Sequence, residues 1–276
     1  PVLSGVQVLP LRTPTLPPAT HTNCVVAGGG KLVVIDPASP YLEEQERLAD
    51  CVAERIAQGE KLERVLLTHH HGDHVGGVEA FCQRFDVPVA AHPETRRLLQ
   101  GIVGVDEDLM DGDRVAYGNG QFLTALHTPG HAPGHLVFYD RENGWMMAGD
   151  MVAGQGTIVI DPPSGSMGTY IEQLRRLIVE GPNRIVASHG PLIVEPNLLL
   201  EHYIRHRFWR EDRIHTFLDE AGPSRVDQVV SGIYQDVVPA ALPIAARQTL
   251  AHLEHLEEQG RVSRLQKGKW EARSAH

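Results

Sequence analysis

The side chains with the clearest chemical potential lie in one short run, His69-His70-His71-Gly72-Asp73-His74. Imidazole and carboxylate groups are suitable zinc ligands, and they also bind iron or manganese. The strand-like segment Arg64–Thr68 precedes the run, and apolar residues recur at roughly helical spacing after it, at Val75, Val78, Phe81 and Phe85. The run therefore lies on a predicted strand-to-helix turn, where a rigid scaffold can make ligands converge. A solvated, histidine-rich loop is the alternative interpretation.

Three later positions carry the same kinds of side chain, each after a predicted strand and beside a glycine or a turn. His131 lies in Thr128-Pro129-Gly130-His131, Asp150 follows Gly149, and His189 precedes Gly190-Pro191. Proline and glycine form tight turns that project a single side chain. One histidine after a strand is more often structural than a ligand, but seven metal-type residues at strand ends favour a shared site.

Two successive α/β halves are predicted to carry these turns. In the first half, the strands Cys24–Ala27 and Lys31–Asp36 meet at Gly28-Gly29-Gly30, which lacks the GxGxxG spacing and so favours a hairpin over a phosphate loop. A Pro-rich segment around a short strand precedes them. The later elements of this half are a helix with Leu48, Val52 and Ile56 on one face and a strand over Val87–Ala91.

The second half is mostly β at first. Strands are predicted over Gln121–Leu126, Leu136–Tyr139, Trp145–Ala148 and Arg184–Ser188, and a helix near Thr169, which has capping-box spacing with Glu172. We expect a four-layer αββα sandwich, with the two sheets facing each other and the ligands on loops at one edge.

The rest of the chain is predicted to be helical and then winged. A long amphipathic helix covers Glu195 to about Ala221, and helices over Val226–Tyr234 and Ile244–Gln259 precede two short strands around Lys267-Gly268. This order is the outline of a winged helix-turn-helix. We expect a catalytic domain over 1–221, ending in the long helix of about 195–221, and a winged-helix-like domain over 222–276.

The charge of the chain disfavours a general nucleic-acid or anionic-membrane binder, because the formal net charge is −10. Residues 223–276 hold seven Lys/Arg against six Asp/Glu, which leaves −11 for the preceding residues. The predicted recognition helix carries Glu254, Glu257 and Glu258 against Arg247, whereas such helices are usually basic. A packing or dimerisation module is therefore favoured over a nucleic-acid reader, and a homodimer is one expectation.

The three cysteines, Cys24, Cys51 and Cys82, are odd in number and form no CxxC pair, which is typical of a reducing, cytoplasmic setting. Residues 1–20 have no charged n-region and no long apolar run, so we expect no signal peptide. No stretch approaches the length of a membrane span, and we expect no membrane partner.

The chain resembles the metallo-β-lactamase superfamily of metallohydrolases. The resemblance covers about residues 1–220 and depends on four motifs, of which the first is highly specific: Thr68-His69-His70-His71-Gly72-Asp73-His74-Val75-Gly76-Gly77, Thr128-Pro129-Gly130-His131, Gly149-Asp150 and Ser188-His189-Gly190. The resemblance implies the metallo-β-lactamase sandwich fold and a binuclear metal site.

By that likeness, His69, His71 and His131 hold one metal ion, Asp73, His74 and His189 hold the other, and Asp150 bridges them. His70 is not expected to be a ligand. Two Zn²⁺ are the expected cofactors, with Mn²⁺ or Fe as alternatives.

The expected chemistry is a hydrolysis by a bridging hydroxide, since zinc lowers the pKa of a bound water from 15.7 to about 7. Asp73 and Asp150 are the predicted catalytic residues, Asp73 because it is placed to take up and relay a proton. The electrophile would be a carbonyl or a phosphorus atom.

β-Lactam hydrolysis is not expected. The antibiotic-degrading enzymes resemble this chain in fold but use a cysteine ligand where this chain has Asp150, and many carry a basic or small residue in place of His74.

The closest resemblance is to the β-lactamase-like protein 2 branch, which has a C-terminal winged helix. Ala251–Val262 fits that module, as do Tyr170–Leu174 and His202–Arg207 the branch's helices. The glyoxalase II group shares the segment from Thr128 to His135, but its glutathione-binding tail does not map onto this chain.

Relatives of the branch resemble either thioesterases or endoribonucleases that act on single-stranded RNA. We expect a thioester or ester hydrolase with a small acyl substrate, and the single-stranded endoribonuclease is the alternative. Arg205, Arg207, Arg210 and Arg213 on the long helix could bind RNA phosphates, a substrate carboxylate or a carrier phosphate, or they could be solvated charges.

An alternative of another class is an iron-dependent oxidoreductase of the same fold. The full set of seven ligands disfavours mononuclear dioxygenases, and the absence of a following flavin domain disfavours the diiron partners of flavoproteins.

Some further residues have weaker expectations. His92 is a pocket-lining or, more often, a capping residue, and His127 and His135 are expected beside the ligands. Tyr170 and Thr157 are candidates for substrate contact.

Overall fold

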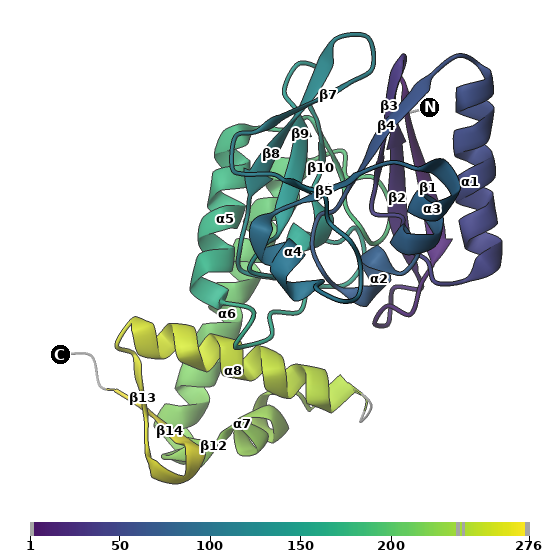
Figure 1. The fold of residues 1–276 in the computed structure, drawn as a ribbon. Helices are drawn as coiled ribbons and strands as arrows, with labels where there is room; N and C mark the ends of the chain where they lie inside the picture. The colour runs from purple at the N-terminus through teal and green to yellow at the C-terminus, as the bar shows by residue number, and fades with distance from the viewer. Residues whose placement is uncertain (1–2, 236–237, 239–240, 274–276) are drawn as a thin grey trace.

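The computed structural model describes residues 3–235, 238 and 241–273. Two mixed β-sheets lie face to face, with helices on the outer face of each, and a smaller domain lies below them (Figure 1). This arrangement confirms the predicted αββα sandwich and the winged helix. Among the described residues, no helix is both long and apolar enough to cross a membrane.

The first sheet contains six strands in sequence order, with the Pro-rich strand β1 at its edge. Its strands are β1 (Val6–Arg12), β2 (His21–Ala27), β3 (Lys31–Ile35), β4 (Lys61–Leu66), β5 (Val89–Ala91) and β6 (Glu107–Asp108). Strands β3 to β6 run parallel to their neighbours, so that the ends of β3 and β4 lie at the same edge. The helices of this half are α1 (Leu42–Ala57), α2 (Gly72–Val75), α3 (Val78–Phe85) and α4 (Pro93–Leu98).

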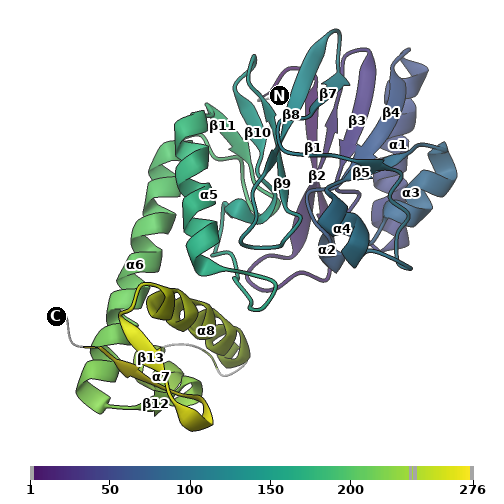
Figure 2. The same ribbon diagram turned by 60° about the vertical axis from the view of Figure 1, so that its left-hand side comes forward.

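The second sheet has the order β11-β10-β9-β8-β7. Its strands are β7 (Arg114–Tyr117), β8 (Gln121–His127), β9 (Leu136–Asp140), β10 (Trp145–Met147) and β11 (Arg184–Val186). The 3-10 turn η1 (Gly149–Met151) follows β10, and the helices α5 (Met167–Glu180) and α6 (Pro196–Ala221) cover this sheet, as Figure 2 shows.

Alternation along the strands builds three apolar layers, because successive side chains point to opposite faces. Between the sheets, Val33 and Ile35 of β3 pack with Leu123 and Phe138 of the second sheet. On the outer faces, one cluster joins the first sheet to α1 and α3, and another joins the second sheet to α5 and α6. The interlocked layers hold the loops at the sheet edges in fixed positions.

Two local predictions were wrong. The helix after the histidine run is interrupted at Gly76-Gly77, because an added Cβ at Gly77 would lie 2.7 Å from the Ser39 carbonyl oxygen. The helix α5 begins at Met167 rather than Thr169, because Ser166 is its N-cap and accepts a hydrogen bond from the Thr169 amide.

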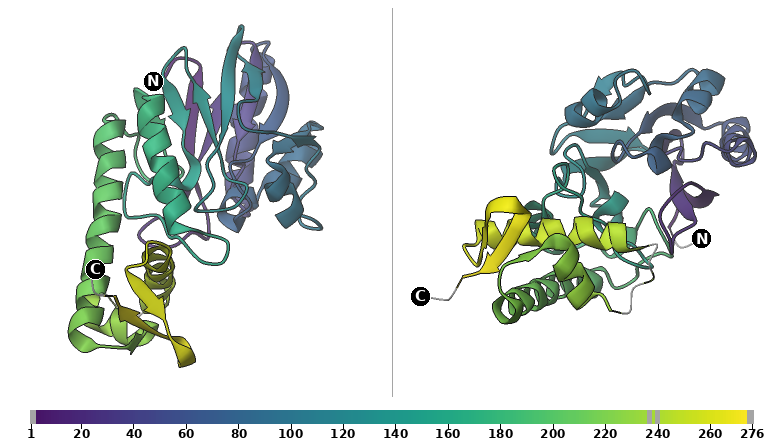
Figure 3. Two further views of the ribbon diagram at one scale, coloured as in Figure 1. Left: turned by 90° about the vertical axis from the view of Figure 1, so that its left-hand side faces the viewer. Right: turned by 90° about the horizontal axis from the view of Figure 1, so that it is seen from below.

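The C-terminal domain consists of β12 (Ser224–Arg225), α7 (Val226–Ile233), α8 (Leu242–Glu258), β13 (Val262–Arg264), the 3-10 turn η3 (Gln266–Gly268) and β14 (Lys269–Ala272). Its core includes Trp270 and Leu253 together with Ile214 and Leu218 of α6. The long helix α6 therefore belongs to both cores, and it runs from the sandwich into the smaller domain in both panels of Figure 3. The predicted domain boundary at 221/222 stays a prediction.

A buried polar cluster joins α6 to α8. The Glu211 carboxylate of α6 accepts hydrogen bonds from Nδ1 of His252 at 3.2 Å and of His255 at 2.8 Å. Burial lowers the pKa of His252 to about 4, even though the neighbouring Glu211 acts in the opposite direction. His252 is therefore neutral in the folded protein at neutral pH.

This depressed pKa predicts a loss of stability in mild acid. Between pH 6.5 and about 4 the unfolded chain protonates His252 while the folded protein does not, so stability falls as pH falls through this window. The full contribution is about 3 kcal/mol. Urea unfolding of metal-free wild type and His252→Gln, followed at pH 7 and pH 4.5, should give a smaller pH dependence in the variant. Equal pH dependence in the two proteins would contradict the buried, neutral histidine.

Candidate metal centre

All seven predicted ligands converge at one edge of the sandwich. His69 and His71 follow β4, Asp73 and His74 lie in α2, and His131, Asp150 and His189 follow strands of the second sheet. Three overlapping groups have potential ligand atoms within 4.8 Å of one another: His69, His71 and His131; His69, His74 and Asp150; and Asp73, His74 and His189. The structure therefore brings together residues up to 120 positions apart in the sequence.

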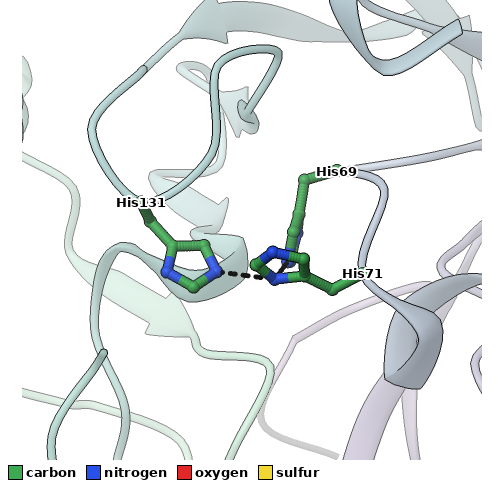
Figure 4. A group of neighbouring side chains, drawn as sticks. All are labelled: His69, His71 and His131. Atoms are coloured by element: carbon green, nitrogen blue, oxygen red, sulfur yellow. Dashed lines mark hydrogen bonds between the residues drawn. The ribbon is translucent and has the colours of Figure 1, made fainter. Parts of the chain in front are cut away.

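The first group is a cluster of three ring nitrogens that face one point (Figure 4). Nδ1 of His71 lies 2.9 Å from Nε2 of His69 and 3.0 Å from Nε2 of His131. Nitrogens that bind one tetrahedral zinc at 2.0–2.1 Å lie roughly 3.3 Å apart. The observed separations are close to this value, so the three side chains fit a single metal ion.

The second group faces the two carboxylates. Oδ1 of Asp150 lies 3.4 Å from Nε2 of His189 and 3.5 Å from Nε2 of His74, whereas its Oδ2 lies 3.5 Å from Nε2 of His131. Oδ2 of Asp73 lies 3.6 Å from Nε2 of His189. One carboxylate thus points an oxygen toward each group, which is the geometry that a bridging ligand requires.

Two buried atoms in this centre lack partners among the described residues. Nε2 of His74 and Oδ1 of Asp150 make no hydrogen bond there. Such orphaned groups are costly in a protein interior unless something compensates them. The donor set of five imidazoles and two carboxylates fits divalent cations, and these unpaired atoms point into the place where cations would lie.

Hydrogen bonds outside the cluster orient the imidazoles. Nδ1 of His74 contacts Oδ2 of Asp36 at 2.9 Å, Nδ1 of His131 the Val159 carbonyl at 2.8 Å, and Nδ1 of His189 the His21 carbonyl at 3.0 Å. An N–H donated to an oxygen fixes the tautomer and leaves Nε2 free as a ligand. Each of these rings is therefore directed toward the centre through Nε2.

His135 supports the turn that carries Asp150. Its Nε2 accepts a hydrogen bond from the Asp150 amide at 3.0 Å, and its Nδ1 contacts the Thr128 hydroxyl at 2.8 Å. Gly149 has φ of +54°, and an added Cβ there would lie 2.4 Å from the His135 ring. Glycine is therefore required for the ring to reach the Asp150 backbone.

Comparison with known families agrees with this geometry. Residues 17–189 match the model of the metallo-beta-lactamase superfamily. The chain belongs to the metallo-β-lactamase superfamily. Residues 226–270 match the beta-lactamase associated winged helix domain, in agreement with the winged helix in the structure.

Similar proteins extend the likeness to both domains. A beta-lactamase-like protein 2 homolog of Drosophila melanogaster is 29% identical over 260 residues, which cover 87% of this chain and 84% of that protein. An atrochrysone carboxyl ACP thioesterase of Aspergillus chevalieri is 28% identical, with 84% and 75% covered. The crystal structure of a metallo-beta-lactamase family protein from Thermus thermophilus superimposes with a TM-score of 0.81 at 25% identity and covers 99% and 100%.

Charges in this metallo-β-lactamase centre are strongly coupled. Burial lowers the pKa of His74, but the carboxylates of Asp150, Asp73 and Asp36 outweigh burial and raise it to about 10. Burial and the neighbouring imidazoles lower the pKa of His71 to about 3. In the metal-free protein a proton on His74 partly balances the carboxylates, and a bound cation would take over that role.

The other residues singled out in the sequence have varied positions. His92 accepts a hydrogen bond from the Glu94 amide and caps α4, and its ring stacks on His127. Thr157 lines the cleft at the metal centre, as predicted. The prediction for Tyr170 was wrong, because this residue is fully buried and donates its hydroxyl to the Met151 carbonyl. His70 belongs to none of the three ligand groups.

Asp36 is the contributor that sequence reasoning missed. It ends β3 with φ of +51°, is fully buried, and accepts hydrogen bonds from both the amide and the hydroxyl of Thr68 as well as from His74. An acidic residue at the end of an apolar strand, one residue before a proline, was the available signal.

Replacement of Asp36 by asparagine should weaken metal binding. The Asn oxygen can still accept from Thr68, but an amide orients the His74 ring less firmly, and loss of such an outer partner costs roughly 10–100-fold in affinity. Zinc titration against a chromophoric chelator measures this. Asp113→Asn is the control, because that carboxylate bonds only within its own turn, to the Met110 amide. Unchanged zinc affinity in Asp36→Asn would show that His74 needs no such support.

Proposed function

We propose that this protein is a dinuclear metal-dependent hydrolase that cleaves a thioester or ester of a small acyl substrate. The observation that carries the proposal is the cleft beside the metal centre, which has a volume of about 610 Å³ and mostly apolar walls. Its walls come from the Pro-rich loop 14–19, the segment 153–161 and the start of α8. His71, Asp73, His131, Asp150 and His189 form its floor.

The residues present define how such a site would work. Metal ions held by the seven ligands would supply an acidified water and an electrophilic face for a developing oxyanion. Asp150 keeps the two ligand groups in register through its two oxygens. Asp73 lines the cleft and has an ionised carboxylate, because its neighbouring His74 and His189 outweigh burial and lower its pKa. It is therefore placed to accept a proton at the floor of the cleft.

An acyl group fits the cleft better than an RNA strand does. Among the described residues that line it, Arg247 is the single Lys or Arg, and it pairs with Asp161 at 2.8 Å. Single-stranded RNA is usually bound by a positively charged groove with exposed aromatic platforms. A carbonyl substrate with an apolar acyl chain needs neither feature.

The arginines of α6 give the ribonuclease alternative little support. Arg207 is buried and donates a hydrogen bond to the Ile158 carbonyl, and Arg205 pairs with Glu201. Arg210 and Arg213 both stack on Trp209. These two, with the half-exposed Trp209, are the strongest basis for RNA binding on this helix, and they do not line the cleft.

Hydrolysis of acyl thioesters is the experiment that tests the proposal. Zinc-reconstituted protein should hydrolyse short acyl-coenzyme A substrates, and Asp150→Asn should lose more activity than the roughly 10–100-fold expected from an outer partner. Labelled single-stranded RNA should remain intact in a parallel assay. RNA cleavage that depends on Asp150 would replace this proposal by the endoribonuclease, and iron as the bound metal with oxygen uptake would replace it by an oxidoreductase.

The apolar wall at α8 predicts chain-length selectivity. Ile244 lines the cleft, so Ile244→Trp should narrow it and lower kcat/KM for an octanoyl thioester roughly tenfold more than for an acetyl thioester, in the range by which pockets discriminate small apolar groups. The exposed neighbour Leu242→Trp, which does not line the cleft, serves as the control. Equal effects on the two substrates would remove Ile244 from the acyl site.

A further inference from the structure

One segment of the catalytic domain lies between the metal centre and the C-terminal domain. It runs from Ile158 to Asp161 and lines the cleft together with Arg247 of α8. The side chains of Ile158 and Ile160 are buried in the core cluster that includes Ala251 of α8. In Figure 1, α8 lies directly beneath the sandwich, between it and α7.

Gln248 of α8 holds this segment from below by two hydrogen bonds. Its Oε1 accepts from the Ile160 amide at 2.7 Å, and its Nε2 donates to the Ile158 carbonyl at 3.2 Å. Arg207 of α6 donates to the same carbonyl at 2.7 Å. Gln248 and Arg207 are both buried, so these bonds do not compete with solvent.

The residue between the two clamped positions faces the metal centre. The Val159 carbonyl contacts Nδ1 of His131 at 2.8 Å, and Nε2 of the same ring lies 3.0 Å from Nδ1 of His71. A continuous line of hydrogen bonds therefore joins α8 to a metal-ligand position through one tripeptide. The orientation of the His131 ring depends on where the Val159 carbonyl is held.

We propose that Gln248 is a positioning residue for the metal centre: by clamping the backbone on both sides of Val159, it fixes the carbonyl that orients His131. The C-terminal domain thereby completes the ligand group of His69, His71 and His131. The other group, Asp73, His74 and His189, has its own supports at Asp36 and at the His21 carbonyl, neither of which belongs to this line. Gln248 therefore acts on one metal position and not on the other.

This asymmetry separates positioning from a general effect on folding. A variant that merely loosened the domain interface would lower stability without selecting one metal position. Loss of the clamp should instead weaken binding at the His131 position alone. The inference needs the proposed metal binding but no particular substrate, so its test does not depend on finding the reaction.

The test is a zinc titration against a chromophoric chelator with wild type, Gln248→Leu and Thr249→Val. Thr249 is the matched control, since it is the buried neighbour in the same helix and bonds only to the Ala245 carbonyl. His131→Ala and His189→Ala identify which binding step belongs to which position. Gln248→Leu should weaken the step that His131→Ala removes by roughly 10–100-fold, as for other outer partners, and leave the second step unchanged. Thr249→Val should bind zinc as wild type does.

Two outcomes would overturn the proposal: wild-type affinity at both positions in Gln248→Leu, or equal weakening of both. Gln248→Asn, which keeps the amide but is one methylene shorter, provides the same measurement if the leucine variant does not fold. A wild-type protein that binds a single zinc would refute the dinuclear site, yet the Gln248 effect would still be measured on that zinc if His131→Ala abolishes it. A single zinc that is indifferent to His131 would overturn both.

Discussion

The structure depends on one electrostatic constraint, the burial of two carboxylates and five imidazoles within a few ångströms of one another. Ionised carboxylates are costly to bury unless positive charge compensates them. Asp150 is nearly buried and ionised, because the nearby His74 and His189 outweigh burial and hold its pKa well below the usual range. A divalent cation compensates such carboxylates better than a proton does, since it can accept several ligands at once. The centre is therefore built for cations, and the sandwich supplies the rigidity that keeps the ligands from moving apart.

The two halves of the sandwich contribute to this constraint in different ways. The first half provides four ligands from a single turn after β4, where local sequence alone brings them together. The second half provides three single ligands from separate turns, and each needs its own support. His135 holds the Asp150 turn, the Val159 carbonyl holds His131, and the His21 carbonyl of the first sheet holds His189. The last of these contacts links the two sheets, so the packing of one against the other also sets the geometry of the centre.

This division explains what could be predicted from the sequence. The seven residues could be identified because the chemistry of their side chains and their places after strands are local features, and so could the sandwich and the winged helix. Asp36 was missed because its partner His74 is 38 positions away and only the pairing of β3 with β4 brings them together. Tyr170 was misassigned because helical spacing does not reveal that its hydroxyl turns inward to the Met151 carbonyl. The role of Gln248 was invisible for the same reason, since 88 positions separate it from Ile160.

The orientation of α8 bears on what the C-terminal domain does. In a DNA-binding winged helix, the corresponding helix enters the major groove and is exposed. Here Gln248, Ala251 and His252 of α8 are buried, and the first two face the catalytic domain. The basic wing is partly neutralised by the protein itself, through the pairs of Arg261 with Asp212 and of Arg264 with Glu254. A helix buried on this face cannot also read a nucleic acid with it. The module instead supplies one wall of a cleft of about 610 Å³, a volume that suits a small ligand better than a polymer.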